Sequence, residues 1–86
     1  MKKTYTILVL VDKFARSDSY KDIERHWEIP VIITAFSKSE AVNKAHGIAR
    51  EQAQAEYQAE HGTRLGNWRT SIYKVDTAAT GPKKKI

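Results

Sequence analysis

Histidine is the residue type in this chain best suited to metal binding or acid–base chemistry, and there are three histidines. His46 and His61 lie fifteen residues apart in one predicted helix, about 22 Å along its axis, so a single metal ion cannot bind both. His26 stands between Arg25 and Trp27, where alternation in an extended segment separates the side chains and leaves no ligand pattern. We therefore predict surface histidines, no metal site and no cofactor.

The motifs of nucleophilic and phosphate chemistry are absent from the sequence. There is no cysteine, no Gly-x-Ser-x-Gly elbow and no serine placed beside a histidine by local spacing. Gly62 and Gly66 are four residues apart, but no Gly-Lys-Ser/Thr follows them and they open no helix. The sequence predicts a protein that is not an enzyme.

The best candidate for a binding site is a group of cationic and aromatic residues at a predicted loop–strand junction. A guanidinium beside an indole suits stacking on a base, pairing with phosphate or anchoring a protein partner. The alternative is that Trp68 closes the end of the core and the arginines only flank it. The predicted partner-binding residues are Arg64, Asn67, Trp68, Arg69 and Tyr73.

The net charge of +5 is concentrated near one end of the chain, because the lysines at 83–85 supply three units and residues 1–80 carry twelve basic against ten acidic side chains. We predict one folded domain over residues 1–78 and a flexible basic tail over residues 79–86. The lack of cysteine fits a reducing compartment, and no run approaches the ~20 apolar residues of a membrane span. These features predict a cytoplasmic protein with no membrane partner.

Three segments have the composition of β-strands. The first is apolar on both faces, which is typical of a central strand. Pro30 has no N–H to donate, so it belongs near the start of its strand or on an edge strand. The polar residues 15–26 lead either to a short helix near residues 19–27 or to a long hairpin connection. The predicted strands are residues 3–11, 28–36 and 68–76.

A long helix is predicted between the second and third strands. Ser37 is placed to accept a hydrogen bond from the Glu40 amide, and the Glu40 side chain to accept one from the Ser37 amide. Gly62 is placed to end the helix in the left-handed conformation, after residue 60 or 61. The predicted sheet-facing stripe is Ala41, Ala45, Ile48, Gln52, Ala55 and Ala59, flanked by Val42 and Ala49, and the predicted outer stripe is Asn43, His46, Arg50, Tyr57 and His61.

These elements predict an α+β fold, in which one long helix packs on a three-stranded, mostly antiparallel sheet in β-β-α-β order. A helix near residues 19–27 would shift the order toward β-α-β-α-β. A single helix covers one face of the sheet, and apolar side chains also fall on the other face. Either residues 19–27 cover them, or they form an exposed patch for a partner or for a second copy in a homodimer. These predicted interface residues are Leu8, Leu10, Ile32 and Phe36.

The order strand, strand, Ser-x-x-Glu-Ala-opened helix, strand resembles that of short accessory proteins of tailed phages. It is carried by Ile29–Phe36, then Ser37, Glu40, Ala41 and Ala45, then Trp68–Val75. Several such proteins block host nucleases, host polymerase or defence complexes, anti-CRISPR proteins among them. Several imitate DNA with acidic surfaces, whereas this chain is basic, so the resemblance implies docking on an acidic protein surface or on nucleic acid. It carries over no site residue.

The function predicted from these observations is that of a small non-catalytic binding protein, an inhibitor or modulator that docks on a larger host complex. The alternative is a nucleic-acid-binding accessory protein with little sequence preference. The two differ in their response to salt, because phosphate contacts make affinity fall steeply as the salt concentration rises.

Overall fold

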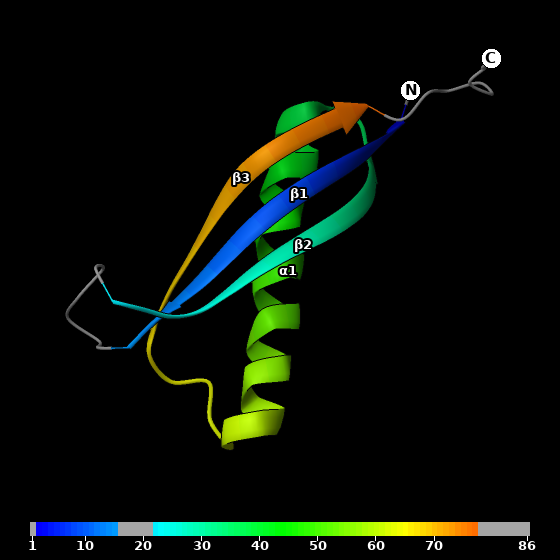
Figure 1. The fold of residues 1–86 in the computed structure, drawn as a ribbon. Coiled ribbons are helices and arrows are strands. Elements are labelled where there is room, and N and C mark those ends of the chain that lie inside the picture. The colour runs from blue at the N-terminus through cyan, green and yellow to red at the C-terminus, as the bar shows by residue number, and fades with distance from the viewer. Residues whose placement is uncertain (1, 16–21, 78–86) are drawn as a thin grey trace, which may run out of the picture.

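The computed structural model describes residues 2–15 and 22–77. The chain forms strands β1 (Lys3–Phe14) and β2 (Ile23–Ala35), helix α1 (Lys38–His61) and strand β3 (Asn67–Thr77). The sheet is antiparallel in the order β2-β1-β3, and α1 lies across one of its faces (Figure 1). The predicted α+β fold and its β-β-α-β order are confirmed. The predicted tail, 79–86, and the beginning of the helix considered near 19–27 lie outside the described residues.

The core lies between the sheet and α1. Alternate residues of β1 point toward the helix, and Ile7, Val9 and Val11 are completely buried there. Their partners in β2 are equally apolar: Ile7 pairs with Val31 and Val9 with Ile29. Because β1 pairs with a strand on each side, it is the central strand that its apolar composition predicts.

The second strand begins five residues before its predicted start. The residues from 23 to 27 belong to β2, so the helix considered near 19–27 is wrong for this described part of it. Trp27 points into the core, whereas Arg25 reaches carboxylates on α1. A strand whose inward side chains pair with charges on a helix lacks the apolar alternation by which strands are recognised. Pro30 lies in the middle of β2, which is an edge strand as its missing N–H requires.

Both ends of α1 are capped. The Ser37 hydroxyl accepts a hydrogen bond from the Glu40 amide at 3.1 Å, as predicted. The Glu40 carboxylate accepts from the Phe36 amide at 2.9 Å, one residue earlier than predicted. Gly62 has φ of 78° and its amide donates to the Gln58 carbonyl, which ends the helix where the sequence predicts.

The sheet-facing stripe of α1 differs from the predicted one after its first two members. Ile48, Gln52, Ala55 and Ala59 are exposed, and Tyr57, predicted on the outer stripe, is buried. The helix crosses a twisted sheet, so its contact follows a row of every fourth residue, which winds around the helix axis. The buried residues of α1 are Ala41, Ala45, Ala49, Ala53 and Tyr57.

Candidate functional site: the open face of the sheet

No helix or strand of the described residues covers the face of the sheet that points away from α1 (Figure 1). Along β2, exposed and buried side chains alternate, and Ile32 is 73% exposed between two buried neighbours. Phe36, just beyond β2, is 65% exposed, and Tyr73 of β3 is 68% exposed. We call this surface the open face. Its members discussed below are Leu8, Leu10, Asp12, His26, Glu28, Ile32, Arg69 and Tyr73, with Phe36 at its margin.

The middle of the open face contains a pocket. It has a volume of about 210 Å³ and is lined by Leu8 and Leu10 of β1, Glu28 of β2 and Tyr73 of β3. The register places Tyr73 at an irregularity in the pairing of β1 with β3, where Leu8 pairs with Lys74 and Val9 with Ile72. Such a bulge changes the direction of a side chain, and here the Tyr73 ring lies beside the apolar side chains of Leu8 and Leu10.

One end of the open face carries a polar group drawn from all three strands. The Asp12 side chain is 7% exposed and lies 2.6 Å from His26 Nδ1, and it accepts a hydrogen bond from Arg69 at 3.1 Å. The Arg69 guanidinium also lies 5.3 Å from the centre of the Phe14 ring. A carboxylate that fixes one imidazole nitrogen leaves the other, Nε2, directed toward Glu28 at 3.6 Å.

The hydrogen bond to Asp12 raises the pKa of His26 above its ordinary value of 6.5. A histidine with a raised pKa stabilises the folded state most when it is protonated. This stabilisation is fully present below about pH 6.5 and is lost as the pH rises through the raised pKa. We expect the free energy of unfolding to fall as the pH rises from about 6.5 through the raised pKa, and to change less in His26→Gln. Denaturant unfolding at several pH values measures this; equal slopes for both proteins would contradict it.

The five predicted partner-binding residues do not form one surface. Trp68 faces the helix side, stacks on Trp27 with ring centres 5.5 Å apart and donates from Nε1 to the Arg64 carbonyl. Arg64 pairs with Glu51 of α1 at 3.0 Å. Asn67 is half-buried at the start of β3, opposite Phe14. Arg69 and Tyr73 lie on the open face and Trp68 on the opposite side, because consecutive residues of a strand point to opposite sides. The packing of Trp68 matches the alternative in which it closes the end of the core.

Three of the four predicted interface residues, Leu8, Leu10 and Ile32, share one side of the sheet, and Phe36 lies just beyond the end of β2. Leu8 and Leu10 are half-buried, whereas Ile32 and Phe36 are exposed. Residues 23–27 lie within β2 and do not fold over them. The Lys2 ammonium lies 5.2 Å from the centre of the Phe36 ring at the margin.

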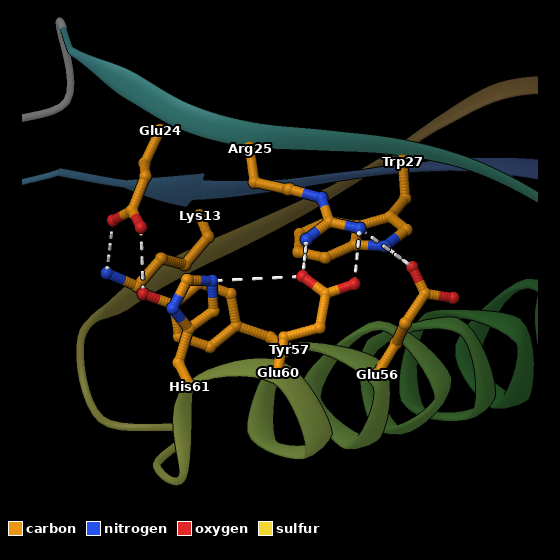
Figure 2. Close-up of polar contacts among 8 residues, drawn as sticks. All are labelled: Lys13, Glu24, Arg25, Trp27, Glu56, Tyr57, Glu60 and His61. Carbon is orange, nitrogen blue, oxygen red and sulfur yellow. Dashed lines mark hydrogen bonds and ion pairs between the residues drawn. The ribbon is translucent and has the colours of Figure 1, made fainter.

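A second polar group, on the other side of the sheet, fastens β1 and β2 to the end of α1 (Figure 2). The Lys13 ammonium lies 2.8 Å from a Glu24 oxygen, and the Tyr57 hydroxyl donates to the other Glu24 oxygen at 2.8 Å. The hydrogen bond between Lys13 and Glu24 raises the pKa of Lys13 and lowers that of Glu24. This group has a structural role, because its polar atoms bind one another.

The same group continues along α1 through a guanidinium and two carboxylates. Arg25 binds both Glu56 and Glu60, and the indole Nε1 of Trp27 donates to Glu56 at 2.9 Å (Figure 2). The hydrogen bond from Arg25 lowers the pKa of Glu60. His61 stacks on Tyr57 with ring centres 4.2 Å apart. Glu56 and Glu60, one turn apart in α1, are the feature of the sequence that could have indicated this ion-pair group. Their partner, Arg25, is more than thirty residues away in the sequence, so spacing alone does not reveal the pairing.

Among the described residues, no three histidine or acidic side chains are grouped so that they could hold a metal ion. His46 is half-buried and its Nδ1 lies 2.7 Å from the Thr70 hydroxyl, so it is not the surface histidine that was predicted. The helix in the described part of the chain is not long and apolar enough to cross a membrane. Comparisons with family models, curated proteins and solved structures found no match to this chain.

Proposed function

We propose that this chain is a small non-catalytic binding protein whose open face docks on another protein. The observation that supports the proposal is the exposure of Ile32 and Tyr73 on the same face of the sheet as the half-buried Leu8 and Leu10. Contiguous apolar side chains on one face, rimmed by polar groups, are typical of protein interaction sites. The resemblance to phage accessory proteins adds the role of an inhibitor or modulator of a larger host complex.

The pairing of the cations of β3 favours a protein partner over nucleic acid at the open face. The cations of β3 are both held by carboxylates: Arg69 lies 3.1 Å from Asp12, and Lys74 lies 3.8 Å from Asp76. On the helix side, Arg25 and Arg64 are likewise paired with glutamates. Binding to phosphates requires cations that are free to displace counterions, and the nearby carboxylates partly offset the charge of these four side chains.

Ile32→Lys tests the proposal, with Ile48→Lys as the matched control. Both isoleucines are exposed, but Ile32 is on the open face and Ile48 is on α1. Each variant, tagged, is used to capture partners from extract of the producing cell, with and without nuclease. We expect a nuclease-resistant protein partner that Ile48→Lys retains and Ile32→Lys loses. Circular dichroism and the thermal midpoint should show that both variants are folded.

Three results would overturn the proposal. Equal capture by the two variants would remove the open face from the interaction. Loss of the captured material on nuclease treatment would put nucleic acid in place of a protein. A dimeric wild type that Ile32→Lys converts to a monomer, seen by light scattering, would make a second copy of the chain the occupant.

A further inference from the structure

The pocket on the open face combines an apolar floor with one carboxylate. Leu8 and Leu10 form its apolar part, Tyr73 adds an aromatic ring and Glu28 adds a negative charge. An apolar ligand would leave Glu28 without a partner, and a small anion would be repelled by it. The lining instead matches a side chain with an aliphatic stem and a cationic end.

Glu28 has weaker polar contacts than the other glutamates of the described residues. Glu24 and Glu40 each accept two hydrogen bonds, and Glu56 accepts from both Arg25 and Trp27. In the described part of the chain, Glu28 has only His26 Nε2, at 3.6 Å, and its side chain is 65% exposed. That distance is too long for a good hydrogen bond, so the carboxylate retains its capacity to accept.

We propose that this pocket binds an arginine side chain presented by the partner protein. The methylene stem would lie on Leu8 and Leu10, and the guanidinium would bridge the Glu28 carboxylate and the Tyr73 ring. Arginine fits better than lysine because its planar guanidinium forms two parallel hydrogen bonds to a carboxylate and stacks on aromatic rings. The inference rests on the proposed function, since it names what the partner brings to the open face.

The charges around the pocket are compatible with a cationic ligand. Lys74 pairs with Leu8 in the register, but its charge is offset by Asp76 at 3.8 Å. Arg69 is bound to Asp12, which also holds His26. A neutral His26 leaves Glu28 free for the ligand, whereas a protonated His26 competes for it. Arginine binding should therefore strengthen as the pH rises through the pKa of His26.

The probe is the blocked peptide acetyl-Gly-Arg-Gly-amide, titrated into ¹⁵N-labelled full-length protein by NMR at low salt. The same peptide with citrulline, which is neutral and of the same shape, is the matched ligand. We expect saturable shifts at Leu8, Leu10, Glu28 and Tyr73, with at least about tenfold weaker binding of the citrulline peptide. Glu28→Gln should reduce arginine binding to the citrulline level, whereas Asp22→Asn, an exposed acidic residue outside the pocket, should leave it unchanged.

Equal binding of the two peptides, or arginine binding that survives in Glu28→Gln, would overturn the inference. The proposed function has a separate readout. If Glu28→Gln still captures the partner that Ile32→Lys loses, while no arginine peptide binds at the pocket, the open face remains the docking surface and the arginine assignment is wrong. If the peptide binds as expected but Ile32→Lys and Ile48→Lys capture equally, the pocket stands and the docking proposal fails.

Discussion

Ala49→Leu is expected to lower the free energy of unfolding by about 2 to 3 kcal/mol, whereas Ala55→Leu should change it by less than about 0.5 kcal/mol. Ala49 is completely buried between α1 and the sheet, and Ala55 is exposed on the same helix. A leucine at position 49 must either push the helix away from β1 and β2 or adopt a strained rotamer. At position 55 it meets solvent and costs only a small amount of helix propensity, because alanine is the best helix former.

Urea denaturation, monitored by circular dichroism, measures the free energy of unfolding of the two variants. The two variants add the same side chain to the same helix, so the difference between them reports only which side faces the sheet. A larger loss of stability in Ala55→Leu than in Ala49→Leu would support the sheet-facing stripe predicted from the sequence.

Glu24→Ala is expected to cost about 3 kcal/mol, because it leaves the buried Lys13 ammonium without its counter-ion. The Lys13 side chain is 8% exposed, and its ammonium also donates to the Phe14 carbonyl at 3.2 Å. We place the cost at the lower end of the range for broken buried ion pairs, since 34% of the Glu24 side chain is open to water. The Tyr57 hydroxyl loses its acceptor in the same variant.

The double variant Lys13→Met/Glu24→Ala distinguishes two causes of the stability loss in Glu24→Ala: the unpaired charge of Lys13 and the missing contacts of the Glu24 side chain. Methionine keeps the length of the lysine stem and has no charge to solvate, so the double variant should recover most of the stability that Glu24→Ala loses. Glu28→Ala on the open face, where the carboxylate is exposed, is the control and should be close to neutral. A double variant less stable than Glu24→Ala would show that Lys13 stabilises the fold without Glu24.

The parts of the fold that could be predicted from the sequence are those with local signals. The Ser37–Glu40 capping pair and Gly62 mark the helix ends, and β1 is recognisable because it is apolar on both faces. The first half of β2 was missed because Arg25 and Glu24 find their partners on α1 and β1, far away in the sequence. The buried stripe of α1 was misplaced because it depends on how the helix crosses the twisted sheet.

In the candidate site, too, local features could be predicted from the sequence and contacts between distant residues could not. Alternation along a strand was enough to place Trp68 and Arg69 on opposite sides, so their separation could have been predicted from spacing alone. The meeting of Asp12, His26 and Arg69 could not, because it requires the register of three strands. The position of Leu8, Leu10 and Ile32 on the face away from α1 could be predicted because each stands out of phase with the main apolar set of its own strand.

The central position of β1 also constrains the order in which the chain folds. Its pairing with β2 closes a short connection, whereas its pairing with β3 joins Tyr5 to Thr77 across nearly the whole chain. The entropy of loop closure favours early formation of the β1–β2 hairpin and late docking of β3, a step of high contact order. Until β3 docks, one edge of β1 presents unpaired amides and carbonyls to any other extended chain. In a cell, the interval between synthesis of β1 and arrival of β3 is therefore the time at which this protein is most exposed to aggregation and most dependent on chaperones.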